Sequence, residues 1–359
     1  MTIAVHPIAT DAPRRHLPEG KLGFGTIFTE YMLNRVWGGA AGPGWHEPRI
    51  EPRGPIAMDP AASVLHYGQT IFEGMKAFRG SDDRIRLFRP ERNAARFATS
   101  AERVCLPALP AEDFVQGIKE LVLLEKSWVP STPGASLYIR PTMIATEGFL
   151  GVRPASEVLY YVIMCPVDAY YATGFAPVKI WVESNHVRAA KGGLGAAKAG
   201  ANYVASLYAA EAAKKKGFAQ VLWTDASHHE MIEEVGTMNL FVQIGDEVIT
   251  PSLDGSILPG VTRESVIHLL TTRGMRVVER PISLTELKAA HTAGTLREVF
   301  GTGTAAVISP VGLLAGETLG ELVIGDGGTG PLAQSLFDEI TQIQRGERPD
   351  PFGWVHILD

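Results

Sequence analysis

A segment rich in proline, glycine and small residues divides this chain of 359 residues into two parts. It reads PVDAYYATGFAP over residues 166–177 and separates two regions of alternating strand-like and helix-like patterns. Exposed linkers between domains have this composition. The sequence therefore predicts an N-terminal domain over residues 1–165, a linker over 166–177 and a C-terminal domain over 178–359.

Both parts mix short strands with scattered helices. Apolar alternation and β-branched runs predict strands near residues 26–36, 57–66, 70–78, 84–88, 136–144, 157–164 and 178–183. Helical periodicity and capping signals predict helices at residues 90–103, 111–126, 201–216, 262–273, 284–293 and 330–345. The regular βαβα alternation of a Rossmann fold is absent, so the fold class indicated is a mixed α/β (α+β) one.

Charge and composition exclude several classes of partner. The formal net charge is −6 and the sequence has no long basic run, which argues against nucleic acid or an anionic membrane surface as a partner. The longest apolar run, residues 158–167, is about half as long as a membrane-spanning helix. The start of the sequence lacks the pattern of a secretory signal, so we expect a cytoplasmic protein. Cys105 and Cys165 have no CxxC or histidine neighbours, so no metal site is expected.

A glycine-rich segment, KGGLGAAKAGAN, surrounds Lys198 with small residues. A phosphate-loop interpretation fails, because Ala197 and Ala199 flank the lysine where that motif requires glycine and a hydroxyl residue. A lysine placed among alanine and glycine is partly desolvated, which favours the nucleophilic amine that a Schiff base requires. An ordinary surface lysine remains an alternative, and Lys191 competes for the same role.

Two further charged residues are candidates, but neither signal is specific on its own. Glu234 lies in MIEEVGTMNLF and could equally be a solvated carboxylate in a turn. Arg96 lies in RLFRPERNAARF, where a surface salt bridge is the ordinary explanation.

The segment KAGANYVAS closely resembles the lysine motif of branched-chain aminotransferases, which are fold type IV pyridoxal-phosphate enzymes of the class IV aminotransferase family. Six more segments resemble motifs of that family and occur in the same order along the chain: YGQTIFEGMKAFRG, RLFRPERNAARF, SLYIRP, EEVGTMNLF, ILPGVTRES and REVFGTGTAAVISP. They extend from about residue 23 to residue 311. The resemblance implies a two-domain fold type IV protein with a smaller N-terminal α/β domain and a larger C-terminal domain of mixed strands and helices.

The resemblance implies pyridoxal 5'-phosphate as the cofactor and no metal. Lys198 matches the catalytic lysine, which forms the Schiff base and then moves a proton as base and acid. Glu234 matches the carboxylate that keeps the pyridine nitrogen protonated. Tyr203 matches the tyrosine that hydrogen-bonds the phenolic oxygen, and Arg96 matches the arginine that binds the phosphate. Further cofactor contacts are implied for Thr237, Val261, Thr262 and Thr304. A helix predicted to begin near Thr262 would place the phosphate at a helix N-terminus.

The resemblance also implies a substrate pocket for branched side chains. Its residues match Phe24, Tyr67, Phe72, Tyr138, Arg140, Leu150, Val152, Tyr170 and Ala305. Ordinary core packing is the alternative for any one of the aromatic residues. Arg140 would orient neighbouring tyrosines and help to receive the side-chain carboxylate of glutamate. Tyr67, Leu150 and Val152 would come from a neighbouring subunit, which implies a homodimer with its active site at the interface and in the cleft between the domains.

The function implied is the ping-pong transfer of the amino group from L-leucine, L-isoleucine or L-valine to 2-oxoglutarate. A D-amino acid transaminase or an aminodeoxychorismate lyase would keep the fold and change the chemistry. A non-catalytic phosphate- or nucleotide-binding module is the alternative from another class. Assays with L- and D-substrates separate the branched-chain enzyme from these two enzymes of the same fold. Absorbance near the aldimine band decides on the binding module, because a nucleotide binder would be colourless.

Overall fold

The computed structural model describes residues 2–9, 12–168 and 175–358. The chain divides into two compact units. Unit 1 comprises Met1–Tyr170, Ala197–Gly200 and Gln342–Asp359, and unit 2 comprises Tyr171–Ala196 and Ala201–Thr341. These units differ from the predicted domains in assigning residues 197–200 and 342–359 to unit 1, and the predicted domain boundaries stay a prediction. Unit 1 is the larger of the two, because the last strand of the chain and the short segment around Lys198 pack with the N-terminal residues.

Unit 1 is built on one mixed sheet, which has nine strands within the described residues. Their order is β1-β3-β2-β8-β7-β5-β6-β18, and β4 pairs with β7. The strands are β1 (Ala4–Val5), β2 (Tyr31–Gly38), β3 (Arg49–Pro52), β4 (Thr70–Phe72), β5 (Met75–Arg79), β6 (Ile85–Phe88), β7 (Ser136–Ala145), β8 (Glu157–Val167) and β18 (Val355–Leu358). The apolar run 158–167 forms the central strand β8, as the sequence predicted.

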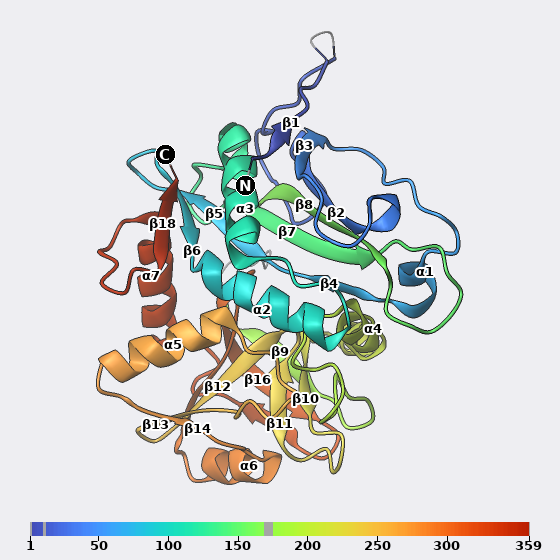
Figure 1. Cartoon of the computed structure of the whole chain (residues 1–359). Helices are drawn as coiled ribbons and strands as arrows, with labels where there is room; N and C mark the ends of the chain where they lie inside the picture. The colour runs from blue at the N-terminus through green and yellow to red at the C-terminus, as the bar shows by residue number, and fades with distance from the viewer. Residues whose placement is uncertain (1, 10–11, 169–174, 359) are drawn as a thin grey trace. The chain divides into compact units, whose positions relative to one another are not determined.

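The two faces of β7 have different surroundings. Leu137, Ile139 and Met143 are fully buried. They share their face with Tyr160 of β8, which lies opposite Met143 in the sheet register and packs on rings of α2 (Pro90–Arg103) and α3 (Ala111–Leu124). Figure 1 shows these two helices on one side of the sheet. Since successive side chains of a strand alternate between faces, Tyr138, Arg140 and Thr142 point to the opposite side, away from these helices.

The predicted strand over residues 57–66 is wrong. The chain forms a short helix there, α1 (Ser63–Tyr67), which ends at Gly68 in the left-handed conformation with φ 62°. Two features explain the difference. Pro60 cannot donate a ladder hydrogen bond, and the glycine provides a helix C-cap. The predicted strand over 70–78 is likewise interrupted at Glu73 and Gly74, between β4 and β5.

Unit 2 also contains one mixed sheet, with nine strands within the described residues. Their order is β11-β10-β9-β16-β15-β12-β13-β14, and β17 pairs with β16. The strands are β9 (Val178–Val182), β10 (Gln220–Thr224), β11 (Ile232–Val235), β12 (Met238–Ile244), β13 (Glu247–Thr250), β14 (Arg276–Glu279), β15 (Leu296–Gly303), β16 (Val307–Gly316) and β17 (Gly320–Val323). The rings of Phe241 and Phe300 stack at 5.3 Å between their centroids, on adjacent strands of this sheet.

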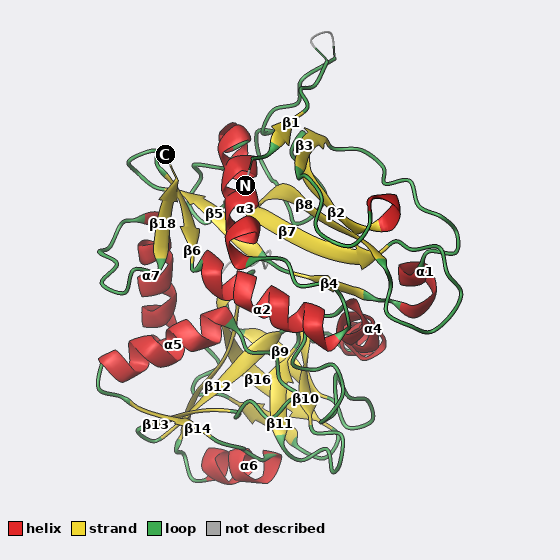
Figure 2. Ribbon diagram, in the orientation of Figure 1, coloured by secondary structure: helices red, strands yellow, loops and turns green. Residues whose placement is uncertain are grey.

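The later helices follow the predicted positions closely. Figure 2 distinguishes them from the strands and loops. They are α4 (Gly200–Lys215), α5 (Val261–Thr272), α6 (Leu284–Thr292) and α7 (Pro331–Arg345). The described residues also form two short 3-10 helices, η1 (Gly39–Ala41) and η2 (Lys126–Trp128).

Candidate active site

The segment that carries Lys198 is fixed along strand β4. The Lys198 amide donates a hydrogen bond to Ser100 Oγ at 2.9 Å, and its carbonyl accepts one from the Phe72 amide at 3.0 Å. Ala199 forms a β-bridge with Ile71. The half-buried Lys198 side chain places Nζ 5.0 Å from the centroid of the Phe72 ring. The backbone of the lysine is thus held on both sides.

Lys191, the competing lysine, has different surroundings. Its side chain is 73% exposed, and Nζ lies 2.9 Å from Asp254 Oδ2. The hydrogen bond with Asp254 raises the pKa of Lys191, which favours the protonated form over a nucleophilic amine. These observations favour Lys198.

Arg96 is buried and forms an ion pair with a residue that the sequence did not single out. Arg96 Nε lies 2.7 Å from Glu73 Oε1, and Nη2 donates to Glu73 Oε2 at 2.9 Å. Asn93 Nδ2 donates to the same Oε2 at 2.8 Å. Burial raises the pKa of the Glu73 carboxyl, but the charge and hydrogen bonds of Arg96, the charge of Lys198 and the Asn93 hydrogen bond outweigh it and lower the pKa. The alternative of a surface salt bridge is therefore excluded for Arg96.

A polar stripe on α2 accounts for this arrangement. Asn93, Arg96 and Ser100 recur at helical spacing, and all three are buried. Buried polar residues on one face of an amphipathic helix are a signal that the sequence contained, although it could not identify Glu73 as their partner.

Four of the predicted substrate residues meet on the side of the sheet that α2 and α3 leave uncovered. The rings of Phe24 and Tyr138 lie 5.0 Å apart. Arg140 Nη2 donates to Tyr138 Oη at 2.9 Å, and its Cζ lies 4.6 Å from the centroid of the Phe72 ring. Gly74 is required beside them, because a Cβ there would come closer than 3.0 Å to Tyr138 Oη. Phe72 therefore contacts both Arg140 and Lys198.

The other predicted substrate residues of unit 1 lie on an exposed surface. Tyr67 Oη donates to the Leu150 carbonyl at 2.7 Å. The side chains of Tyr67, Leu150 and Val152 are 44%, 64% and 89% exposed. Tyr170 lies outside the described residues.

Unit 2 contains the second group of predicted residues, centred on Glu234. This residue is 3% exposed, so the solvated-carboxylate alternative is excluded. Its Oε1 accepts hydrogen bonds from Asn239 Nδ2 and the Leu258 amide, both at 3.1 Å. Its Oε2 lies 2.7 Å from Nε of Arg188, whose guanidinium also donates to the Ser256 carbonyl. The sequence did not identify Arg188 or Asn239, because their partners are distant in the chain.

A small pocket forms beside Glu234. It is lined by Arg188, Asn202, Tyr203, Ser206, Glu234, Gly236, Thr237 and Leu258. Three residues that the sequence assigned to the cofactor, Tyr203, Glu234 and Thr237, are thus brought together.

Val261 and Thr262 form the first turn of α5, and both are buried. The N-cap residue Gly260 provides no side-chain hydrogen bond, so the first amides of the helix have no capping side chain from that position. Thr304 and Ala305 occupy the turn between β15 and β16 and do not line the pocket beside Glu234.

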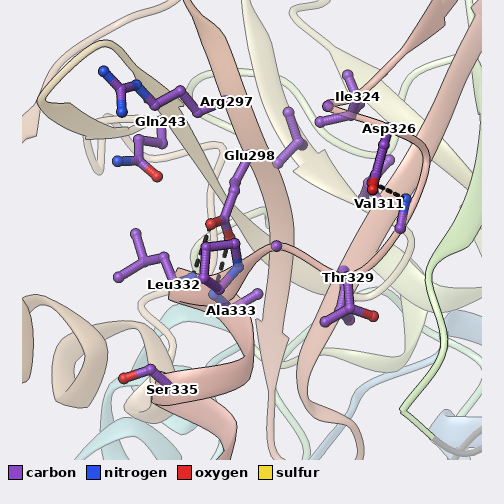
Figure 3. Close-up of a pocket in the computed structure, with 16 residues that line it drawn as sticks. Gln243, Arg297, Glu298, Val311, Ile324, Asp326, Thr329, Leu332, Ala333 and Ser335 are labelled. Atoms are coloured by element: carbon purple, nitrogen blue, oxygen red, sulfur yellow. Dashed lines mark hydrogen bonds between the residues drawn. The ribbon is translucent and has the colours of Figure 1, made fainter.

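A larger pocket of unit 2 contains none of the predicted residues. Figure 3 shows Glu298 pointing toward the first turn of α7, where its carboxylate accepts hydrogen bonds from the Leu332 and Ala333 amides at 2.8 and 2.9 Å. The carboxylate therefore caps the helix.

The described residues show neither a membrane-spanning helix nor a metal-binding cluster. In residues 2–9, 12–168 and 175–358, no helix combines the length and apolar character needed to cross a bilayer. The same parts of the chain contain no group of three or more His, Cys, Asp or Glu side chains placed to hold a metal ion.

Comparison with known proteins identifies extensive similarity. The family model for class IV aminotransferases matches residues 70–314. Branched-chain-amino-acid aminotransferase 2 of Bacillus subtilis (strain 168) is 50% identical over 357 residues, covering 99% of this chain and 96% of the relative. The branched-chain-amino-acid aminotransferase of Mycolicibacterium smegmatis is 45% identical over 356 residues, covering 98% of this chain and 96% of the relative.

Solved structures share the fold. The T.th. branched-chain amino acid aminotransferase with pyridoxamine 5'-phosphate superposes with a TM-score of 0.74 at 26% identity, covering 90% of this chain and 98% of that chain. The Escherichia coli branched-chain amino acid aminotransferase gives a TM-score of 0.71 at 26% identity, covering 84% of this chain and 94% of that chain.

Proposed function

The chain belongs to the class IV aminotransferases, and we propose that it transfers the amino group of L-leucine, L-isoleucine or L-valine to 2-oxoglutarate. Pyridoxal 5'-phosphate is the cofactor. The observation that carries the proposal is the grouping of Lys198 with Phe72, Tyr138 and Arg140, which combines a reactive amine, aromatic walls and one guanidinium.

The residues present fit a phosphorylated pyridine. When bound, pyridoxal phosphate supplies the electron sink for the negative charge that forms on the substrate α-carbon. Glu234 is a buried carboxylate held by two hydrogen bonds and by an ion pair with Arg188, which suits it to keep a proton on a ring nitrogen. Arg96 has a guanidinium and α5 has a helix N-terminus, and each of these groups is suited to bind a phosphate.

Lys198 would hold the cofactor and move the proton. Its fixed backbone limits the amine to the positions that the side-chain torsions allow, and this reduces the entropy that must be lost before a proton is transferred. The same amine can remove the proton from the substrate α-carbon and return it elsewhere, since a single group near its operating pKa serves as base and then as acid.

The aromatic residues and Arg140 account for the choice of substrate. An apolar surface formed by Phe24, Phe72 and Tyr138 favours a branched aliphatic side chain, at about 0.8 kcal/mol for each buried methylene. Arg140 would receive the distal carboxylate of glutamate or 2-oxoglutarate, because a guanidinium binds a carboxylate through paired hydrogen bonds. The site would thereby accept two unlike substrates in alternation.

We propose that the protein is a homodimer in which Tyr67, Leu150 and Val152 reach the active site of the neighbouring subunit. Their exposure supports this assignment, because an interface requires side chains that the isolated subunit leaves accessible. Val152→Asp should lower the dimer fraction in analytical ultracentrifugation, whereas a wild-type protein that sediments as a monomer would refute the assignment. A cytoplasmic location stays a prediction, with which the two free cysteines agree.

The test of the function is the visible absorption spectrum of the purified holoenzyme before and after addition of L-leucine. We expect the band of the cofactor to shift to that of its aminated form in the wild type and in a Lys191→Ala control. Lys198→Ala should not complete this half-reaction. A protein that stays colourless with added pyridoxal phosphate, or that reacts with D-alanine and not with L-leucine, would overturn the proposal, and the second result would favour the D-amino acid transaminase.

A further inference from the structure

Glu73 is a fully buried carboxylate to which neither the sequence nor the proposed chemistry assigns a role. Its side chain has no exposed surface, and three groups donate to it: Arg96 with two nitrogens, Asn93 and the Gly74 amide. Glu73 directly follows Phe72 in the sequence. The Phe72 amide donates a hydrogen bond to the Lys198 carbonyl, and the Phe72 ring contacts Lys198 Nζ. Glu73 thus stands between the residue assigned to the phosphate and the residue assigned to the aldehyde.

We propose that Glu73 is a positioning residue for the cofactor phosphate, acting by holding the Arg96 guanidinium in one orientation. The inference rests on the proposed role of Arg96. Glu73 engages Nε and Nη2, which form one edge of the planar guanidinium. Two parallel hydrogen bonds fix both the plane and the direction of the group, whereas a single bond would leave it free to rotate.

The backbone around Glu73 is itself anchored. The Glu73 amide donates to the Pro141 carbonyl of β7 at 2.8 Å, and Gly74 fits against Tyr138 without room for a side chain. Asn93 and Arg96 are one turn apart on α2 and both donate to Glu73. The carboxylate is therefore a fixed point between a strand end and a helix, as a group that orients a ligand-binding side chain requires.

A purely structural ion pair would have different consequences. Removing one partner of a buried pair leaves a buried charge and lowers stability whatever its role. A positioning residue must in addition affect the ligand that its partner binds. Pyridoxal 5'-phosphate and pyridoxal differ by the phosphate alone, so the ratio of their dissociation constants isolates the contribution of the phosphate site.

The experiment measures the dissociation constants of both ligands for the apo-protein by absorbance titration. In Glu73→Gln we expect binding of pyridoxal phosphate to weaken by about tenfold, as loss of hydrogen bonds to a charged group predicts, and binding of pyridoxal to stay unchanged. Arg96→Gln should lose the same selectivity, and the double variant should lose no more than Arg96→Gln alone. Glu125→Gln is the matched control, because Glu125 is also a buried glutamate of unit 1 and its carboxylate accepts from the Tyr31 amide instead.

The outcomes separate the inference from the proposal on which it rests. If Arg96→Gln keeps the wild-type ratio, the assignment of Arg96 to the phosphate fails and the inference fails with it. If Arg96→Gln selectively weakens binding of pyridoxal phosphate and Glu73→Gln does not, only the positioning role is refuted. Should Glu73→Gln fail to fold, Glu73→Asp provides the test, because it keeps the charge and withdraws it by one methylene. Equal weakening of both ligands in Glu73→Asp would refute the inference, and selective weakening of pyridoxal phosphate would support it.

Discussion

Replacing Gly260 by alanine should disturb unit 2 through one steric contact. A Cβ at this position would lie closer than 3.0 Å to Asn239 Oδ1, a separation that real Cβ atoms do not show. Gly260 has φ −72° and ψ 132°, which alanine adopts freely, so backbone strain does not contribute. Asn239 must therefore move, and its Nδ2 donates both to Glu234 and to the Leu258 carbonyl, at 3.1 and 2.8 Å.

The size of the effect follows from opposing contributions. Overpacking of a filled site costs about 1–3 kcal/mol, and loss of a hydrogen bond costs about 1 kcal/mol more. The reduced entropy of the unfolded chain returns about 0.4–1 kcal/mol. We expect a net destabilisation of about 1–3 kcal/mol, which lowers Tm by about 2–4 °C per kcal/mol in a domain of this size. Binding of pyridoxal phosphate should weaken as well, because Asn239 fixes Glu234.

Gly54→Ala is the matched control for this measurement. Nothing lies within 4 Å of a Cβ at Gly54, and its φ is outside the left-handed region, so alanine there should leave Tm unchanged or raise it slightly. Thermal unfolding followed by circular dichroism compares the two variants with the wild type. A Gly260→Ala protein as stable as Gly54→Ala would refute the steric argument.

Three further variants test other features. Glu298→Gln removes the charge that caps α7 (Figure 3) and should lower stability by about 1 kcal/mol in urea unfolding; no change would show that the cap is dispensable. Phe300→Ala removes a ring stacked on Phe241 and should lower the free energy of unfolding by about 3–5 kcal/mol in the same measurement. A loss as small as that of a substitution at an exposed position would contradict the packing described for this ring. Burial raises the pKa of Glu125 to about 7 from an unfolded value of 4.5, so the folded state binds more protons between these pH values. Stability should fall as pH rises through this window, and Glu125→Gln should flatten that slope of Tm against pH; an unchanged slope would exclude Glu125 as its source.

Local signals predicted the helices best. The helix at residues 90–103 begins and ends as predicted, because Pro90 suits a first turn and one face of the helix is apolar. The strand prediction over residues 57–66 was wrong because α1 is only five residues long. The pattern of apolar residues over so short a segment does not distinguish a helix from a strand. The pairing of β18 with β6 joins segments at opposite ends of the chain, and nothing local identifies it.

The candidate site divides in the same way. The cofactor residues could be named because their motifs resemble a family, and the structure groups Tyr203, Glu234 and Thr237 around one pocket. The residues that hold them were not predicted. Glu73 and Arg188 look like ordinary charged residues in the sequence, and only long-range packing shows that each is the buried partner of a predicted one.

The pairing of β18 with β6 also sets an order on the synthesis of the protein. Translation delivers the strands β9–β17, residues 178–323, before residues 355–358 exist. On the ribosome, the sheet of unit 2 can therefore assemble while β6 still has an open edge, which is a site for unwanted pairing between nascent chains. A polypeptide stalled after residue 330 would have every strand of the second sheet and would lack the strand that covers the edge of the first.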